Sequence, residues 1–171
     1  RGIEDIDHPR VPRYIEDVSV PDGKGGQTFY LVQELVEGSD LENLLKHQGW
    51  RPSEADVEKL LCEVLETLVY LHTRRPPIIH RDIKPANLMR TQDGRLKVLD
   101  FGIAMMKKAS AEIEGGAGLA SDAFDEKFGE QPRSAGTPAY MSPEQLMGVE
   151  QDERVDVWAT GVTLFELLTN T

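Results

Sequence analysis

Two stretches near the middle of the chain hold polar residues whose types and spacing could do chemistry. Residues 80–87 read His-Arg-Asp-Ile-Lys-Pro-Ala-Asn, and residues 100–102 read Asp-Phe-Gly. Asn87 and Asp100 carry amide and carboxylate oxygens, which are the hard ligands that Mg²⁺ prefers in proteins. The residues between them are typical of two short strands joined by a turn at Asp93-Gly94, so Asn87 and Asp100 can meet over one site. Two such oxygens at one place could bind a hard divalent cation.

A third stretch completes an ordered set of motifs. Residues 136–144 read Gly-Thr-Pro-Ala-Tyr-Met-Ser-Pro-Glu. One tripeptide alone is a weak signal, but three motifs in this order are specific. They resemble the catalytic loop, the magnesium-binding Asp-Phe-Gly motif and the segment ending in Ala-Pro-Glu of protein kinases, with Ser142-Pro143-Glu144 in the last place. Over essentially its whole length the chain is similar to Hanks-type (eukaryotic-like) serine/threonine protein kinases, and its motif wording is similar to that of bacterial members.

The resemblance implies transfer of the γ-phosphoryl group of ATP to a protein hydroxyl, with ATP and Mg²⁺ as cofactors. Asp82 matches the carboxylate that orients the hydroxyl and accepts its proton. Lys84 matches the lysine that meets the transferred phosphate in serine/threonine kinases, and Asn87 and Asp100 match the two metal ligands. Lys84 and Thr137 together carry the expectation of serine/threonine specificity.

The same resemblance implies an adenine pocket beside the second strand-like run. It makes Gln33 the gatekeeper, sets the backbone of Glu34 and Val36 against adenine, and puts Asp40 near the ribose. Met89 becomes the floor of the pocket. The alternative for such positions is an ordinary place in the strand core, which is the commoner fate of strand residues.

Regulation is expected in the segment between the second and third motifs. Arg81, directly before the expected base, resembles an arginine that pairs with an activation-segment phosphate and orders that loop. Ser134 is the nearest acceptor, although the family's usual phosphosite is one residue earlier, where this chain has Arg133. We hypothesise autophosphorylation at Ser134, with Ser110 and Ser121 as lesser candidates.

Two further residues are expected to support the site. Asp156 matches an aspartate that hydrogen-bonds the backbone of the catalytic loop, although it could equally cap a helix. Glu144 matches a glutamate whose arginine partner lies in a later helix that this chain lacks. His80 and Phe101 are expected to be structural.

The elements that must position these residues begin with a predicted hairpin. Two strand-like runs, Tyr14–Val20 and Thr28–Val36, flank a turn-rich segment at residues 21–26. In the terms of the resemblance, residues 1–36 are the end of the small lobe and the hinge. Residues 37–171 are the large lobe, ending after its first buried helix. We expect an α+β protein kinase-like fold made mostly of the helical large lobe.

Helical patterns follow the hairpin. A short helix is predicted over Leu41–Gln48, and a longer one begins after Ser53, an expected N-cap with Asp56 three residues on, and ends near His72. Cys62 lies inside the longer pattern and is expected to be a small buried hydrophobe. The apolar positions with helical spacing are Val57, Leu60, Leu61, Val64, Leu65, Leu68 and Leu71.

The last third of the chain contains two contrasting stretches. Residues 107–133 are rich in Gly, Ala, Ser and acidic residues, which predicts a mobile surface segment. Val155–Leu168 is apolar nearly all round, which predicts a helix buried on several sides, with partners that this chain supplies only in part.

Composition narrows the function classes. The chain has 171 residues, 39% hydrophobic and 29% charged, which fits one domain or a large piece of one. We expect a cytoplasmic protein, because residues 1–7 lack a secretory signal and no apolar run could span a bilayer, although the parent protein could be membrane-anchored elsewhere.

The net charge of -11 opposes nucleic-acid binding. The single cysteine excludes an internal disulfide. Expected partners are protein substrates and a second copy for autophosphorylation.

Three functions remain open at this stage. No Gly-x-Gly-x-x-Gly spacing precedes residue 80, and the family's phosphate-gripping lysine is absent too, so this chain alone is expected to be weak or inactive. The favoured function is a serine/threonine protein kinase that is present here in part. The alternatives are a noncatalytic pseudokinase or scaffold that binds proteins, and a small-molecule phosphotransferase of kinase-like fold. The last class lacks the motif at residues 136–144.

Overall fold

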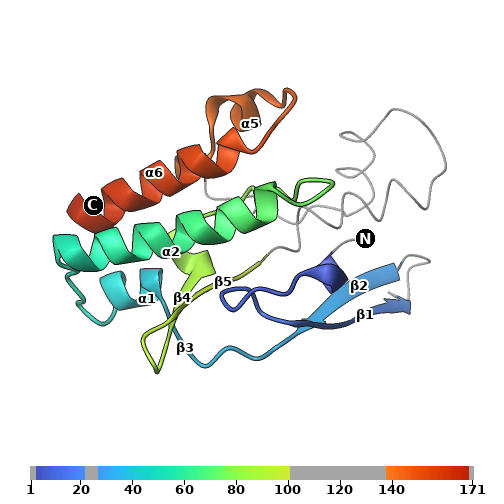
Figure 1. Cartoon of the computed structure of the whole chain (residues 1–171), viewed down its shortest axis with the longest axis horizontal. Helices are drawn as coiled ribbons and strands as arrows, with labels where there is room; N and C mark the ends of the chain where they lie inside the picture. Colours follow the sequence, from blue (N-terminus) through green and yellow to red (C-terminus); the bar gives the residue numbers. More distant parts are fainter. Residues whose placement is uncertain (1–2, 22–26, 101–137, 170–171) are drawn as a thin grey trace.

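The computed structural model describes residues 3–21, 27–100 and 138–169 (Figure 1). Within these ranges the chain forms short strands and 3-10 turns around two long helices. In order, the elements are η1 (Ile3–Asp5), β1 (Tyr14–Pro21), β2 (Gln27–Gln33), β3 (Gly38–Asp40), α1 (Leu41–Lys46), α2 (Glu54–His72), η2 (Pro85–Asn87), β4 (Leu88–Thr91), β5 (Leu96–Val98), η3 (Pro138–Tyr140), α5 (Pro143–Met147) and α6 (Arg154–Thr169).

The predicted hairpin is the antiparallel pair β1–β2, in which Val18 lies opposite Tyr30. The second strand ends at Gln33, three residues before the predicted end at Val36. The ladder stops there because Gln33 pairs with Tyr14, the first residue of β1.

A second small sheet carries the chain toward the motifs. Its order is β3-β4-β5, all antiparallel, and Asp40 in β3 lies opposite Met89 in β4. The turn predicted at Asp93-Gly94 joins β4 to β5, and Gly94 has a φ of 78°. The strands expected near residues 78–100 are therefore found, except that Ile78-Ile79 belongs to no strand.

The long helix α2 confirms the prediction made for residues 54–72. Ser53 accepts a hydrogen bond from the Asp56 N–H, and the Asp56 carboxylate accepts one from the Ser53 N–H, which forms a capping box. Cys62 is exposed, so its expected burial is wrong, and Leu65 is exposed as well. Both fall outside the buried stripe of the helix, which comprises Val57, Leu60, Val64, Thr67, Leu68 and Leu71.

The core lies between α2, α6 and the small sheet (Figure 1). Ile83 and Leu88, from the stretch that holds the motifs, are among the most deeply buried side chains. Burying a side chain of this size stabilises the fold by about 1.5–3 kcal/mol. The stretch that carries the polar motif is therefore anchored in the core by its own apolar residues.

The last helix, α6, is buried along one side only. The buried residues Val155, Ala159, Thr163 and Leu167 recur every four residues along it. Val157, Trp158, Phe165 and Leu168 are exposed. The sequence predicted a helix buried on several sides. Among the described residues, α6 is covered on one side. No helix in the described ranges is long and apolar enough to cross a membrane.

Candidate active site

A buried carboxylate holds the stretch of residues 80–87 by its backbone. Asp156, at the start of α6, is fully buried. Its Oδ2 accepts hydrogen bonds from the His80 N–H at 2.9 Å and from His72 Nε2 at 2.7 Å. Its Oδ1 accepts one from the Arg81 N–H at 2.7 Å. The geometry is that of an aspartate that ties the loop of residues 80–82 to both α2 and α6.

Arg81 has a left-handed backbone, with a φ of 69°. This conformation costs about 1–3 kcal/mol for a residue other than glycine, so surrounding contacts must hold it. Asp156 supplies one such contact, through the Arg81 N–H. The Nε atom of Arg81 is buried and has no hydrogen-bond partner among the described residues.

His80 links the loop to Leu99, the residue just before the second motif. The ring is fully buried, with Nε2 2.8 Å from the Leu99 carbonyl oxygen and Nδ1 3.2 Å from the Asp82 nitrogen. A carbonyl can only accept, so the proton lies on Nε2, and Nδ1 accepts from the Asp82 N–H. Burial lowers the pKa of His80, which agrees with a neutral ring.

The Asp82 carboxylate lies among the other polar residues of the loop. Lys84 Nζ lies 2.8 and 3.1 Å from its two oxygens, and Asn87 Nδ2 donates to Oδ2 at 2.8 Å. Asn87 Nδ2 also donates to the Asp82 carbonyl oxygen at 2.7 Å. Asp82 and Asn87 are buried and Lys84 is partly buried, so the ion pair is shielded from most solvent. The structure therefore gathers Asp82, Lys84 and Asn87 in one cluster.

The two predicted metal ligands are brought together through the backbone. The Leu99 N–H donates to the Asn87 carbonyl oxygen at 2.8 Å, which puts Asp100 beside the end of η2. Asp100 is exposed and has a φ of 62°, another left-handed residue at this site. The side-chain nitrogen of Asn87 is engaged by Asp82, so Oδ1 is the side-chain atom of Asn87 that could hold a metal.

These donors fit a hard divalent cation that also binds phosphate. The described residues contain no cluster of three or more His, Cys, Asp and Glu side chains that could enclose a metal. Mg²⁺ is commonly held by only one or two protein ligands, with substrate phosphates and water completing the shell. One amide oxygen and one exposed carboxylate match that requirement.

The residues expected around adenine lie at the junction of the two sheets. The Nε2 atom of Gln33 is buried without a hydrogen-bond partner among the described residues. The Glu34 carboxylate pairs with Lys97 at 3.2 Å, and the Arg13 N–H is the main cause that lowers the pKa of Glu34. The Glu34 N–H is also taken, by the Arg13 carbonyl oxygen. Val36 is partly buried.

Asp40 and Met89 lie side by side in the β3–β4 pair. Asp40 is also the N-cap of α1, because its carboxylate accepts from the Asn43 N–H at 2.8 Å. The structure thus brings Asp40 close to Met89 but engages one Asp40 oxygen locally.

The third motif is described only from Pro138 onward. Ser134 and Thr137 lie outside the described residues, as do Phe101, Ser110 and Ser121. Tyr140 donates from its hydroxyl to the Glu166 carboxylate, and burial together with that carboxylate raises the pKa of Tyr140. This contact fastens η3 to α6.

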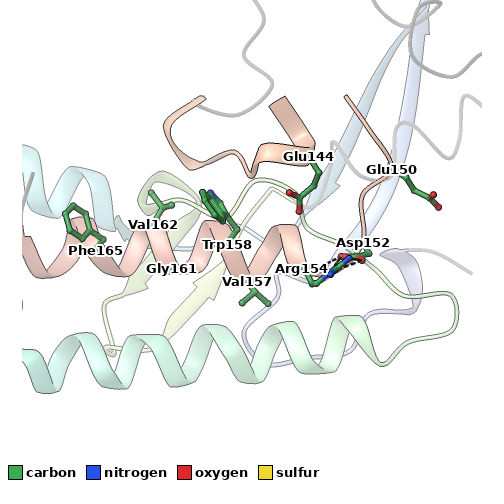
Figure 2. Close-up of a pocket in the computed structure, with 9 residues that line it drawn as sticks. All are labelled: Glu144, Glu150, Asp152, Arg154, Val157, Trp158, Gly161, Val162 and Phe165. Carbon is green, nitrogen blue, oxygen red and sulfur yellow. Dashed lines mark hydrogen bonds and ion pairs between the residues drawn. The ribbon is translucent and has the colours of Figure 1, made fainter. Parts of the chain in front are cut away.

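Glu144 lies in a groove on the outer side of α6, shown in Figure 2. Its carboxylate makes no ion pair with any residue that the structure describes. The apolar side chains of the groove are Val157, Trp158, Val162 and Phe165. Arg154, which also lines it, pairs with Asp152 at 2.7 Å. No residue of the loop at 80–87 lines this groove.

Two residues at the site were not anticipated from the sequence. His72 ends α2 and reaches Asp156 across 84 positions of sequence. Gln145, in α5, donates from its side chain to the Arg81 carbonyl oxygen. Neither belongs to a motif with an expected role, and only the folded chain brings His72 to Asp156 and Gln145 to Arg81.

Comparison with known proteins agrees with this arrangement. The chain matches the protein kinase domain family over residues 2–171. It is 38% identical over 156 residues to a probable serine/threonine-protein kinase of Streptomyces coelicolor, covering 91% of this chain and 20% of that protein. It is 40% identical over 151 residues to serine/threonine-protein kinase F of Synechocystis, covering 86% and 26%. It is 37% identical over 147 residues to serine/threonine-protein kinase PknL of Mycobacterium tuberculosis, covering 86% and 32%.

The chain thus spans between a fifth and a third of the length of these relatives. The family match, in contrast, extends over nearly every residue of the chain. The α+β arrangement of helices and small antiparallel sheets is consistent with part of that domain. The family implies ATP and a divalent metal as the cofactors. The chain belongs to the protein kinase domain family.

Proposed function

We propose that the protein transfers the γ-phosphoryl group of ATP to serine and threonine hydroxyls of other proteins. The observation that carries this proposal is the Asp82 carboxylate, buried with Lys84 and Asn87 in a loop whose backbone is bound by Asp156. A positioned carboxylate can orient a hydroxyl and accept its proton, which is the main task left to protein side chains in phosphoryl transfer.

The roles proposed for the cluster follow from its contacts. Asp82 is the base, because its oxygens lie at the centre of the polar cluster. Lys84 contributes a positive charge next to that carboxylate, where it can meet the transferred phosphate. Asn87 orients Asp82 through its amide nitrogen and offers its remaining oxygen to the metal.

We propose Mg²⁺ as the metal, with Asn87 and Asp100 as its protein ligands. When bound, the cation neutralises the phosphates of ATP. The choice of Mg²⁺ is supported by the small number of hard oxygen donors and by the exposure of Asp100, which leaves room for phosphate and water.

The adenine and ribose of ATP are proposed to bind where the two sheets meet. Gln33 is the proposed gatekeeper, because its buried amide nitrogen has no hydrogen-bond partner in the part of the chain that the structure describes, and Met89 is the proposed floor of the pocket. Because the Glu34 N–H is bound to Arg13, the contacts proposed for adenine there fall to the backbone carbonyl of Glu34 and the backbone of Val36. Asp40 is proposed to reach the ribose with the oxygen that does not cap α1.

The remaining proposals concern regulation and organisation. Arg81 is proposed to pair with a phosphate on Ser134. This role is favoured by its buried Nε atom, which has no hydrogen-bond partner among the described residues. Thr137 is proposed to help select serine and threonine. Residues 1–36 are proposed as the end of the small lobe and the hinge, and residues 37–171 as the large lobe. Asp156 and Glu144 are proposed as structural supports. We propose that the kinase acts in the cytoplasm on protein substrates and on a second copy of itself.

The test is phosphate transfer by the longest native form of the protein that contains this chain. The protein is incubated with [γ-³²P]ATP and Mg²⁺ on a mixture of proteins, beside its Asp82→Asn variant and an EDTA control. Phosphoserine and phosphothreonine that disappear in the variant and in EDTA are the expected result. Label on a small molecule alone would indicate a small-molecule phosphotransferase. No label from a folded protein that binds ATP would overturn the proposal in favour of a scaffold.

A further inference from the structure

The backbone of Arg81 is held at both of its polar groups by side chains from other elements. Its N–H donates to Asp156 in α6 at 2.7 Å, and its carbonyl oxygen accepts from Gln145 Nε2 in α5 at 3.0 Å. Arg81 has a φ of 69° and directly precedes Asp82. Any relaxation of this strained residue therefore moves the Asp82 carboxylate.

Gln145 uses both ends of its amide. Oε1 accepts from the Ser142 N–H at 3.0 Å, which is half of the capping box that begins α5. Nε2 donates to the Arg81 carbonyl oxygen. An N–H must face an acceptor and a carbonyl oxygen must face a donor, so this network admits one orientation of the amide. A glutamate could keep the bond to Ser142 but would turn an acceptor toward the Arg81 carbonyl.

We propose that Gln145 is a positioning residue for catalysis. It makes the geometry of Asp82 depend on the position of the segment at residues 142–147. The last two residues of the motif that ends at Glu144 are the first two of α5, so a displacement of that segment pulls on the Arg81 carbonyl. This inference rests on the proposed function of Asp82 as the base, but the contact itself can be tested without activity.

Three variants of the longest native protein separate the possible causes. Gln145→Glu keeps the acceptor for the Ser142 N–H and loses the donor to Arg81. Gln145→Met has a similar length, adds no charge and loses both bonds. Gln92→Glu adds the same charge at an exposed residue in the turn between β4 and β5, and serves as the control.

The first measurement is steady-state kinetics with Mg-ATP and a protein substrate. We expect kcat to fall roughly 5- to 50-fold in both Gln145 variants, because small misplacements of a catalytic group have effects of this order. KM for ATP should stay within about twofold, since Gln145 touches no residue proposed for the adenine pocket. Gln92→Glu should match the wild type.

The second measurement is amide hydrogen exchange over residues 79–88, followed by mass spectrometry. Loss of the hydrogen bond from Gln145 to the Arg81 carbonyl should speed exchange over residues 79–88 in both Gln145 variants. Exchange in α2 should stay as in the wild type. If Gln145→Met keeps wild-type kcat and wild-type protection, the donor is unimportant and the inference is wrong. If the wild type transfers no phosphate, the proposed function fails, and the exchange data still decide whether Gln145 holds the loop.

Discussion

Replacing Asp156 by asparagine tests the physical basis of the site, because it leaves the shape of the side chain intact. The carboxylate accepts three hydrogen bonds, from His72, His80 and Arg81. An asparagine has one oxygen, so it keeps the two bonds at Oδ2 when its nitrogen replaces Oδ1. The nitrogen then faces the Arg81 N–H, which loses its partner in a partly buried place.

The loss in the free energy of unfolding can be worked out from these contacts. Losing one hydrogen bond to a charged acceptor costs about 1.5–3 kcal/mol. The two remaining bonds weaken because their acceptor is no longer charged. We expect the free energy of unfolding to fall by about 2–5 kcal/mol, a large share of the 5–15 kcal/mol typical of a domain. In the molecules that stay folded, Arg81 can leave its left-handed conformation, and kcat should fall about 100-fold.

The assay is urea unfolding followed by tryptophan fluorescence, since Trp158 lies on the same helix as Asp156. Asp152→Asn is the matched control, because Asp152 makes an exposed ion pair with Arg154 just before that helix and should tolerate the change. Unfolding midpoints and kcat that agree between Asp156→Asn and the wild type would refute the reasoning.

Further predictions concern neighbouring residues. Burial lowers the pKa of His80, so the unfolded state binds its proton first as pH falls below about 6.5, the ordinary value for histidine, and stability is lost from that point downward. Urea midpoints measured from pH 7.5 to 5 should therefore fall more steeply in the wild type than in His80→Gln, and parallel curves would contradict this assignment. Gly38→Ala should cost about 1–3 kcal/mol in urea unfolding, because its Cβ would lie 2.3 Å from the Arg90 carbonyl oxygen; an unchanged midpoint would argue against the β3–β4 pairing. Lys84→Met should lower kcat while ATP affinity, measured by calorimetry, stays within about threefold; a loss of ATP affinity alone would remove Lys84 from the transfer step.

The parts of the fold that depend on neighbouring residues were predictable. The capping box of Ser53 and Asp56 and the apolar spacing after it define α2 within one residue of its ends. The exposure of Cys62 was missed because helical periodicity leaves residues at the border of a stripe ambiguous. The strand β3 was missed because three residues carry no periodic signal and pair with residues 89–91, far along the chain.

The candidate site was likewise predictable from the sequence only in part. The order of the motifs and the family resemblance were sufficient to propose Asp82, Lys84, Asn87 and Asp100 as site residues. The structure brings the first three into one cluster. The contacts that hold the loop depend on tertiary structure. In the sequence, nothing distinguishes Gln145 from an ordinary residue of a short helix. The fold brings its amide to the Arg81 carbonyl oxygen, 64 positions away.

The most direct test of the central claim compares kcat and ATP affinity in Asp82→Asn, using the longest native form of the protein. An asparagine can still accept a hydrogen bond from Lys84 but cannot take the proton of the substrate hydroxyl. We predict a fall in kcat of roughly 100- to 10,000-fold, the usual contribution of a general base, with the dissociation constant for Mg-ATP within about threefold of the wild type. A variant that keeps wild-type kcat would contradict the assignment of Asp82 as the base, and with it the proposed mechanism.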